Sequence, residues 1–537
     1  MSQTDNYSSY PYPSRRNLVF ARNGMVATGQ PLAAQAGLSI LMQGGNAIDA
    51  AIATAACLTV VEPTANGIGG DAFALIWYKG KLYGLNASGP APDSISINRI
   101  KTMGHTVIPM HGFIPVTVPG APAAWNACAK RFGRLPLTKL LQPAIKYAED
   151  GFPLAPELGQ GWQRAATLYR SKLHGEEFSE WFRVFTPQGE IPRTGEVWRS
   201  PDHAQTLRII AETSAESFYR GELAEAIESY AKKYHGFISS HDLANFQPEW
   251  VEPIQVNYRG YDIWEIPPNG QGLIALQALK ILEGFDLAGS KGEESAHLQI
   301  EAIKLAFSDG NKYISDARKM KVTAQDLLES NYLEKRRKQI THHASIPSAS
   351  QLSGGGTVYL ATADSEGNMV SFIQSNYMGF GSGLVVPGTG IALHNRGHNF
   401  SIEPEHINAL EPGKKPYHTI IPGFITRGHH AVGPFGVMGG FMQPQGHVQL
   451  LSGLIDQKLN SQSALDAPRW QWMEGKTIAV ENDYPDKLAA SLRERGHQII
   501  KNHPGAFFGR GQVIQRSNEG TLCGATEKRT DGTVAAW

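Results

Sequence analysis

The feature that most constrains this sequence is a change of pattern near residue 356. Residues 336–356, RRKQITHHASIPSASQLSGGG, combine charge, Ser and Pro with a terminal Gly run, which is typical of an exposed flexible connector. The stretches 358–362 and 369–374 then alternate like strands on either side of a turn at 364–368. We therefore expect two portions, residues 1–356 and residues 357–537, with the connector as their boundary.

Helical patterns dominate the first portion. The run 47–60 is apolar nearly all round, which predicts a buried helix that ends before Pro63. A strand pair is expected at 73–78 and 81–85, and residues 254–266 form one further β excursion. The first portion is therefore expected to be rich in helices and to contribute some strands.

The second portion reads as strands followed by helices. Further strands are expected at 390–395, 419–425 and 433–438. Amphipathic helices are expected at 445–456 and 485–496. The second portion is therefore expected to run from strands to helices.

Charge and hydropathy exclude several classes of protein. Lys and Arg together number 49, as do Asp and Glu, so no electrostatic attraction to nucleic acid or to an anionic membrane is expected. The first residues lack the apolar core of a secretory signal, and no stretch reaches the roughly 18 apolar residues that a membrane span needs. We expect a cytoplasmic protein.

The connector ends in Gly354-Gly355-Gly356-Thr357. A flexible Gly run would allow the Thr357 hydroxyl to approach the Gly356 carbonyl, and the resulting ester could be hydrolysed by water. Thr357 would then carry a free α-amine, whose ordinary pKa of about 7.7–8.0 suits it to act as base for its own hydroxyl. The alternative is a plain Gly-rich loop that enters a strand.

Several segments, in order along nearly the whole chain, resemble the γ-glutamyltransferase family and in particular its glutathione hydrolase-like bacterial proenzymes. They are GMVATGQPLAAQAG (24–37), GGNAIDAAIATAACLTVVEPTANGIGGDAF (44–73), PVTVPGAPAAW (115–125), GGGTVYLATADSEGNMVSFIQSNYMGFGSG (354–383), GPFGVMGG (433–440) and LDAPRW (465–470). The resemblance implies an α+β fold, a four-layer αββα N-terminal-nucleophile hydrolase sandwich built jointly from two subunits. It also implies self-cleavage between Gly356 and Thr357 into a large subunit, 1–356, and a small subunit, 357–537, with Thr357 as the nucleophile.

The resemblance implies two further groups of catalytic residues. Gly439-Gly440 matches a Gly pair whose backbone N–H groups face the reacting carbonyl and stabilise the oxyanion. Ser375 matches a hydroxyl that bonds the nucleophile and its amine, and a hairpin through 364–368 would bring it to Thr357. The alternatives are an ordinary Gly pair at a strand end and a solvent-facing serine.

The chain departs from the family pattern where transpeptidases bind the γ-glutamyl head. Asn86 and Asn399 stand at the positions of the Arg that binds the α-carboxylate and the Asp that binds the α-ammonium, and His418-Thr419 replaces a Ser pair. Since charge-assisted contacts are roughly twice as strong as neutral ones, a zwitterionic head should be held weakly. Arg396, His394 and His418 are the candidates to compensate.

No cofactor or metal is expected. His394 and His398 are spaced i, i+4, but the stretch has no HExxH motif and no third ligand in register. The run Gly67–Ala72 imitates a dinucleotide fingerprint, yet it precedes a strand where that motif would open a helix.

The expected function is cleavage of γ-glutamyl-type amides through an N-terminal Thr acyl-enzyme. The acyl group would pass to water or to an amine acceptor, and the large and small subunits would stay paired. Two alternatives use the same machinery: a glutaryl-type (cephalosporin) acylase and a hydrolase of small dicarboxylic amides such as oxamate. A non-catalytic scaffold is the remaining alternative, against which the retention of Thr357, Ser375 and Gly439-Gly440 argues.

Overall fold

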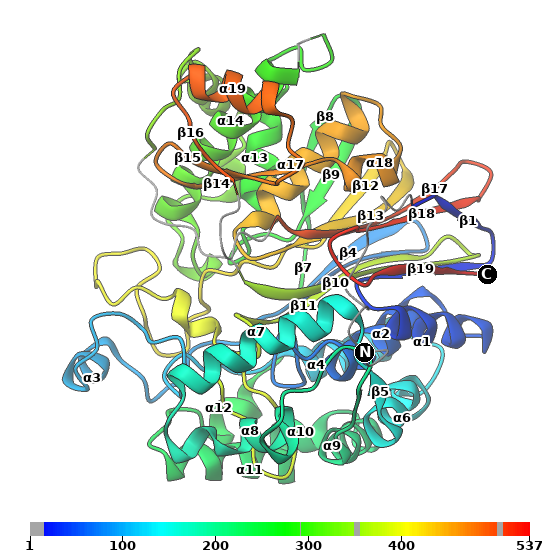
Figure 1. The fold of residues 1–537 in the computed structure, drawn as a ribbon, viewed down its shortest axis with the longest axis vertical. Coiled ribbons are helices and arrows are strands. Elements are labelled where there is room, and N and C mark those ends of the chain that lie inside the picture. Colours follow the sequence, from blue (N-terminus) through cyan, green and yellow to red (C-terminus); the bar gives the residue numbers. More distant parts are fainter. Residues whose placement is uncertain (1–15, 290–291, 348–354, 502–507) are drawn as a thin grey trace, which may run out of the picture.

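Two seven-stranded antiparallel sheets form the centre of the computed structural model (Figure 1), which describes residues 16–289, 292–347, 355–501 and 508–537. The first sheet has the order β1 (Val19–Ala21), β18 (Leu522–Thr526), β17 (Arg510–Arg516), β13 (His430–Met438), β12 (Gly423–Arg427), β9 (Tyr261–Glu265) and β8 (Ile254–Tyr258). The second has the order β19 (Thr533–Ala536), β2 (Gly24–Thr28), β10 (Gly356–Asp364), β11 (Met369–Tyr377), β3 (Asp71–Tyr78), β4 (Lys81–Ala87) and β7 (Glu249–Val251).

The inner faces of the two sheets pack against each other. Phe73 and Tyr359 of the second sheet share one apolar cluster with Phe424 and Ile514 of the first, and all four are buried. β10 and β11 are buried along almost their whole length, because a sheet covered on both faces offers their side chains no solvent.

Helices cover both outer faces (Figure 1). The first sheet is covered by α13 (Gly272–Leu282), α14 (Gly292–Tyr313), α17 (Met442–Ile455) and α19 (Asp486–Glu494), with α15 (Ala324–Leu327), α16 (Ser330–Arg337) and α18 (Ser461–Asp466) nearby. Helices on the side of the second sheet are α1 (Pro31–Met42), α2 (Ala47–Val61), α4 (Ala121–Phe132), α5 (Leu137–Leu140), α6 (Gln142–Asp150), α7 (Pro156–Lys172), α8 (Ser179–Phe185), α9 (Pro201–Glu212), α10 (Glu216–Arg220), α11 (Glu222–Lys233) and α12 (Ser240–Asn245). These four layers confirm the expected αββα sandwich.

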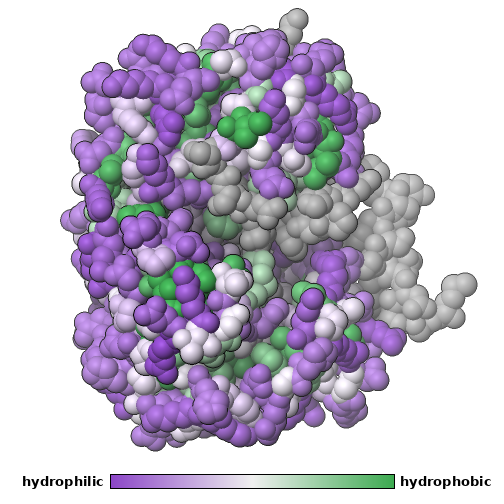
Figure 2. Space-filling view, turned by 90° about the vertical axis from the view of Figure 1, so that its left-hand side faces the viewer, coloured by the Kyte–Doolittle hydropathy of each residue, from purple (hydrophilic) through white to green (hydrophobic). Residues whose placement is uncertain are grey.

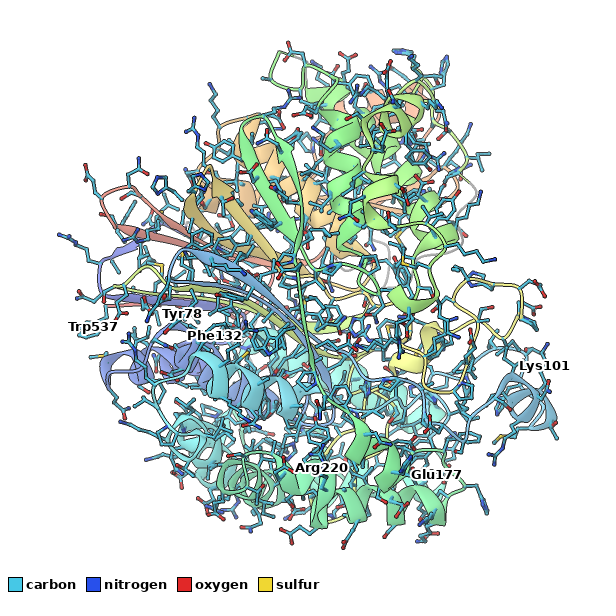
Figure 3. The ribbon with its side chains drawn as sticks, turned by 180° about the vertical axis from the view of Figure 1, so that it is seen from behind. Tyr78, Lys101, Phe132, Glu177, Arg220 and Trp537 are labelled. Carbon is cyan, nitrogen blue, oxygen red and sulfur yellow. The ribbon has the colours of Figure 1, made fainter. Side chains whose placement is uncertain are left out.

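Contacts between α4 and β3 show how this outer layer attaches. The rings of Tyr78 and Phe132 lie 4.9 Å apart between their centroids (Figure 3). Beyond the body, α3 (Ile97–Thr102) carries Lys101 at the periphery of the same view. Two small sheets complete the fold, one of β14 (Trp470–Glu474), β15 (Thr477–Val480) and β16 (Gln498–Ile500), the other of β5 (Phe152–Pro153) and β6 (Val197–Trp198).

Most elements expected from local patterns are present. α2 is buried at every position and begins at a capping box in which Asn46 and Asp49 bond each other's backbone N–H groups. β3 and β4 form the expected hairpin, and β10 and β11 extend the two expected strands that follow the connector.

The prediction of a strand at 390–395 is wrong. Among the described residues this segment makes only isolated bridges, Val385 to Ala392 and Gly69 to Leu393, because no strand pairs with it over consecutive residues. The strand expected at 419–425 begins later, with β12 at Gly423.

Strands from the two portions alternate within each sheet. In the second sheet, β10 and β11 lie between β2 and β3, which come from the first portion. In the first sheet, β12, β13, β17 and β18 lie between β9 and β1. The described residues of the two portions therefore share one fold and one core.

The face drawn in Figure 2 is mainly hydrophilic, with hydrophobic side chains in small separate patches. Among the helices of the described residues, none combines the length and apolar character that a bilayer crossing requires.

Candidate active site

Thr357 lies at the start of β10, where the pairing with β11 is irregular between Gly356 and Val358. The residue is only 1% exposed. Its Oγ1 donates to the carbonyl oxygen of Gly356 over 2.7 Å and lies 3.0 Å from Oγ of Ser375. The Ser375 hydroxyl donates to the same carbonyl oxygen over 2.7 Å. Two hydroxyl groups thus converge on the Gly356–Thr357 peptide.

The hairpin that joins β10 to β11 sets this arrangement. Asp364 Oδ1 accepts from the backbone N–H groups of Glu366 and Asn368, both at 3.0 Å, which fixes the turn. The resulting register pairs Gly356 with Tyr377 and so places Ser375 beside Thr357.

Gly439-Gly440 lies beside the same peptide, between β13 and α17. The φ angles are 140° at Gly439 and 59° at Gly440, which side-chain-bearing residues rarely adopt. A Cβ on Gly439 would lie 3.2 Å from Cα of Gly509, and a Cβ on Gly355 would lie 3.4 Å from Cα of Gly440. The glycine pair thus allows the backbone to pack closely against the residue before the expected cleavage peptide.

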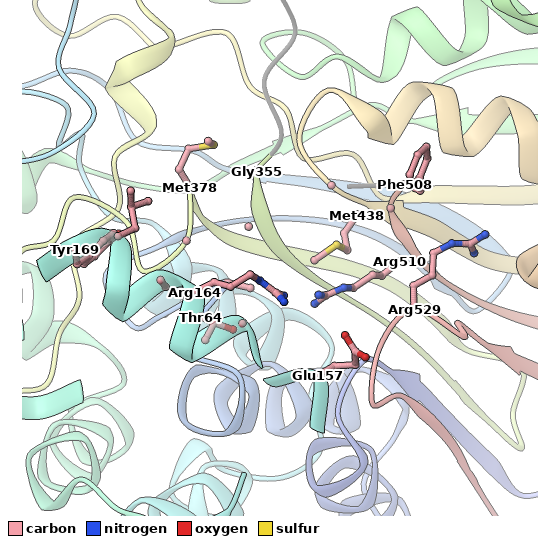
Figure 4. A pocket seen from close by; sticks show the side chains of 18 of the residues that line it. Thr64, Glu157, Arg164, Tyr169, Gly355, Met378, Met438, Phe508, Arg510 and Arg529 are labelled. Atoms are coloured by element: carbon pink, nitrogen blue, oxygen red, sulfur yellow. The ribbon is translucent and has the colours of Figure 1, made fainter. Parts of the chain in front are cut away.

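A cavity of about 580 Å³ opens beside this peptide (Figure 4). Gly355, Gly356 and Gly439 form part of its wall. The larger apolar side chains that line it are Met110, Leu168, Tyr169, Met378, Met438 and Phe508. Its charged lining residues are Glu157, Arg164, Glu481, Arg510 and Arg529. The cavity therefore offers an apolar wall and ionic groups next to one amide carbonyl.

The arginines of the cavity differ in their pairing. Arg529 Nε lies 2.6 Å from Glu481 Oε1, and Arg510 Nη1 lies 3.5 Å from Glu62 Oε1. Among the described residues, no carboxylate oxygen lies within 4.0 Å of a side-chain nitrogen of Arg164. Figure 4 shows the guanidinium groups of Arg164 and Arg510 directed toward each other. Like charges in this position favour an anion between them.

The chain is similar to proteins of a known family. The family model described as gamma-glutamyltranspeptidase matches residues 33–537. The chain belongs to the gamma-glutamyltranspeptidase family. A crystal structure of cephalosporin acylase from Bacillus halodurans is 57% identical, with a TM-score of 0.96 and 99% of each chain covered.

Two curated relatives carry different activities in their names. The glutathione hydrolase-like YwrD proenzyme of Bacillus subtilis is 34% identical, over 96% of this chain and 99% of its own length. The oxamate amidohydrolase proenzyme of Klebsiella pneumoniae is also 34% identical, over 96% of this chain and 98% of its own length. The chain is thus an enzyme of a gamma-glutamyltranspeptidase family whose members are named as hydrolase and acylase proenzymes.

A buried ionic cluster lies where this family member departs from the transpeptidase pattern. Asp71, at the start of β3, accepts from Arg396 Nε at 2.9 Å and from Arg396 Nη2 at 3.2 Å. Arg396 Nη1 donates to Thr419 Oγ1 over 2.7 Å, and its guanidinium lies 4.6 Å from the centroid of the Tyr377 ring. His418 Nε2 lies 2.7 Å from Asp71 Oδ2.

The protonation states in this cluster follow from burial and charge. Burial alone would raise the pKa of Asp71, but Arg396 and His418 outweigh it and hold that pKa well below its usual value. Burial, with the nearby Arg396, lowers the pKa of His418 to about 4. At neutral pH the cluster is therefore an Asp71–Arg396 ion pair with a neutral His418 that donates to the carboxylate.

The two asparagines expected to bind substrate bond to other parts of the chain. Asn86 Nδ2 donates to Asn269 Oδ1 over 2.9 Å, and its Oδ1 accepts from Ser88 Oγ over 2.9 Å. Asn399 Nδ2 donates to the carbonyl of Tyr417 over 3.1 Å. Both therefore hold protein groups, and neither lines the 580 Å³ cavity.

Residues 416–419 are the segment around which the expected binding residues gather. Asn269 links Asn86 to this segment by donating to the Pro416 carbonyl over 2.8 Å, while Arg396 bonds Thr419. The structure thus brings the expected binding residues to one region, Asn86, Arg396, Asn399, His418 and Thr419, but with their polar groups bonded within the protein.

Gln271 is a site residue that the sequence did not predict. Its Nε2 donates to the carbonyls of Thr419, at 2.6 Å, and Gly440, at 2.9 Å, and its Oε1 accepts from Tyr417 at 3.0 Å. One buried amide therefore fixes both the glycine pair and the segment behind it. The run Pro-Pro-Asn-Gly-Gln-Gly before α13 carries no local signal for this role.

The spaced histidines hold separate backbone groups. His394 Nε2 lies 2.9 Å from the Thr117 carbonyl, and His398 Nδ1 lies 2.7 Å from the Ile108 carbonyl. This pair therefore does not converge on one ligand position.

Another group in the described part of the chain has metal-ligand spacing. The ligand atoms of His297, Glu301 and His497 lie within 4.8 Å of one another. However, Lys304 Nζ lies 2.8 Å from Glu301 Oε1 and is itself fully buried, so a metal ion would meet an ammonium group. We read the cluster as a structural ion pair.

Proposed function

We propose that this enzyme cleaves its own chain between Gly356 and Thr357 and then hydrolyses small amides with the new N-terminal threonine. The observation that carries the proposal is the convergence of the Thr357 and Ser375 hydroxyls on the Gly356 carbonyl oxygen, both at 2.7 Å. Attack by Thr357 Oγ1 forms a C–O bond, breaks the C–N bond and passes the hydroxyl proton to the Thr357 nitrogen. Water hydrolyses the ester and leaves residues 1–356 as the large and 357–537 as the small subunit.

The same groups serve turnover. The free α-amine, with an ordinary pKa of about 7.7–8.0, takes the hydroxyl proton as Oγ1 attacks the substrate carbonyl. Backbone N–H groups of the neighbouring Gly439-Gly440 turn stabilise the oxyanion, and Ser375 orients Oγ1. The amine proton goes to the leaving nitrogen, and water, or an amine acceptor, then releases the acyl group.

The acyl group we propose lacks an α-ammonium. A γ-glutamyl head would need a counter-charge, and Asp71, the carboxylate of the buried cluster, is already paired with Arg396 and bonded by His418. Asn399, at the position expected for that counter-charge, is a neutral amide whose Nδ2 already donates a hydrogen bond to the Tyr417 carbonyl. An ammonium group without a counter-charge would be unfavourable.

The second feature we propose for the acyl group is a carboxylate at the end far from the reacting carbonyl. Arg164 and Arg510 point toward each other in the cavity, and an anion between them would relieve their repulsion. The apolar lining suits a short methylene chain, and about 580 Å³ exceeds what a two-carbon amide needs. The best-supported activity is thus hydrolysis of glutaryl-type amides, and the 57% identical relative is likewise named as an acylase, of cephalosporin.

Hydrolysis of γ-glutamyl amides is the second candidate. The named relative of Bacillus subtilis favours it, and so does Glu157, a carboxylate of the cavity wall that could hold an ammonium group. The two candidates differ in one group, the α-amine of the acyl donor.

A denaturing gel tests self-cleavage. The 58.5 kDa chain should give pieces of about 39 and 20 kDa, in proportion to 356 and 181 of 537 residues, with Thr as the N-terminal residue of the smaller. Thr357→Ala should remain one chain and be inactive. A wild-type chain that stays intact on long incubation would refute the proposal.

Matched amides test the acyl group. With one leaving amine, the glutaryl amide should exceed the γ-glutamyl amide at least about tenfold in kcat/KM, since losing one charge-assisted contact costs about 1.5–3 kcal/mol. Arg164→Ala should raise KM for the glutaryl amide but not for a carboxylate-free pentanoyl amide. Arg170→Ala, on the same helix but outside the cavity, is the control. Preference for the γ-glutamyl amide would instead support the second candidate.

A further inference from the structure

A second, much smaller cavity adjoins Thr357 within the sandwich. Its volume is about 10 Å³, and Thr357 shares its wall with Glu62, Arg510 and Gln512. Arg510 and Met438 also line the large cavity, so these two side chains lie between the two spaces. A volume near 10 Å³ is about what one water molecule needs, provided polar partners surround it.

Two buried acceptors in this small cavity have no hydrogen-bond partner among the described residues. They are Oε2 of Glu62, a residue 5% exposed at the end of α2, and Oε1 of Gln512, a residue 1% exposed on β17. A buried acceptor without a hydrogen-bond partner is destabilising. A proton donor in the cavity, either a water molecule or a protonated Glu62 carboxyl group, would satisfy these acceptors.

The charges around Glu62 leave its ionisation finely balanced. Burial raises the pKa of Glu62 to about 7, the Arg510 guanidinium opposes that rise, and the Asp531 carboxylate adds to it. Arg510 and Asp531 are the charged groups that face it, from β17 and from the segment after β18. Thr357, Gln512 and Thr530 supply uncharged polar groups.

We propose that Glu62 is a positioning residue that controls the protonation of the Thr357 α-amine across this small cavity. The inference rests on the proposed N-terminal threonine mechanism. A carboxylate beside Thr357 favours the ammonium form, which cannot act as base, whereas a neutral carboxyl leaves the positive charge of Arg510 to favour the free amine. Glu62 and Arg510 thus act in opposite directions on the group that activates the nucleophile.

The pH dependence of kcat/KM tests this inference. Its acidic limb reports deprotonation of the free enzyme's base. Glu62→Gln keeps the shape and removes the charge, so the limb should move to lower pH by about one unit, the size expected for a nearby buried charge. Gln512→Glu adds a carboxylate to the same cavity and should move the limb to higher pH.

Glu265→Gln is the matched control, because Glu265 is fully buried in β9 and does not line either cavity. The acidic limb of its kcat/KM profile should stay at the wild-type pH. If Glu62→Gln blocks self-cleavage, Gln512→Glu alone decides. A fall in rate without a displaced limb, in whichever variants mature, would overturn the inference and mark Glu62 as structural. Failure of the wild type to release an N-terminal Thr would instead refute the proposed function.

Discussion

The Ser375 hydroxyl points to the expected cleavage peptide because the Tyr377 backbone N–H occupies one acceptor position of its oxygen. The backbone N–H of Tyr377 donates to Ser375 Oγ over 2.7 Å, which leaves the hydroxyl hydrogen directed at the Gly356 carbonyl oxygen. Negative charge develops on that oxygen when Thr357 attacks. A donor already in place stabilises this charge without reorganisation.

Removal of this donor should slow self-cleavage. Ser375→Ala is expected to reduce the rate by about 10²-fold, the usual effect of losing one donor to an oxyanion. Ser375→Thr keeps a hydroxyl and should recover most of the rate. Time courses on denaturing gels measure both. The control is Ser371→Ala on the same strand, whose Oγ lies 2.8 Å from the Tyr359 hydroxyl; equal slowing there would contradict the prediction.

His418 should make stability depend on pH. Its pKa is about 4 in the folded state and about 6.5 when unfolded, so only the unfolded chain takes up this proton between those values. The contribution is fully present above pH 6.5 and is lost as pH falls toward 4, at up to about 1.4 kcal/mol per pH unit.

Chemical denaturation of His418→Gln across this range measures the effect. The free energy of unfolding of the wild type should fall more steeply toward acid than that of the variant. His174→Gln, at an exposed position, should keep the wild-type slope. Parallel curves for wild type and His418→Gln would exclude the neutral buried imidazole.

Single residues also show what the sequence could and could not predict. Thr357, Ser375 and Gly439-Gly440 belong to local motifs, so a resemblance could locate them. Asp71 could not be assigned as the partner of Arg396, because the two are 325 positions apart and only the folded chain brings them together. Arg396 was expected to bind substrate, and its guanidinium instead bonds Asp71 and Thr419.

At the scale of elements, the start of α13 supports the end of β13. Gln271 directly precedes α13, and its amide holds the Gly440 and Thr419 carbonyls. Gln271 thereby positions the glycine turn without lining the 580 Å³ cavity.

Gln271→Leu should therefore reduce kcat and stability together. Leaving the two carbonyls without their donor should cost about 1–3 kcal/mol in the free energy of unfolding. Gln277→Leu is the control, since Gln277 lies within α13 and its amide donates to Asp309 instead. Denaturant titrations should show a similar loss of stability in both variants. Activity assays should show a loss of kcat in Gln271→Leu alone.

Elements were predictable where their signal is local. The β3–β4 and β10–β11 hairpins could be read from alternation and turn residues. The pairing of β10 with β2 could not, because it joins Leu360 to Thr28 across the sequence. The segment 390–395 has strand-like residues, but no partner strand lies in register with it beyond isolated bridges.

For the whole molecule, the interleaved strands should keep the two subunits together after cleavage. The end of the large subunit is held in addition by buried groups: Lys304 Nζ donates to the Ser345 carbonyl over 3.0 Å, and Ala344 N donates to the Arg495 carbonyl over 2.7 Å. The expected cytoplasmic location remains a prediction.

The cleaved protein should therefore elute from a native sizing column as one species containing both chains. The pieces should separate only in denaturant, because shared sheets and a shared core must be broken first. Subunits that separate in ordinary buffer, without loss of secondary structure, would contradict this expectation.

The alternation of strands in the second sheet has a consequence for how the enzyme comes into being. When a single precursor chain folds, β10 and β11 pair between β2 and β3 in one molecule, so the folding rate does not depend on protein concentration. Once the Gly356–Thr357 bond is gone, recovery from full denaturation becomes an encounter between two molecules, each of which lacks the strands that complete its sheets. Under the proposed self-cleavage, the intact chain would guide assembly only once, and the lifetime of the two-chain enzyme would be set by its rate of unfolding.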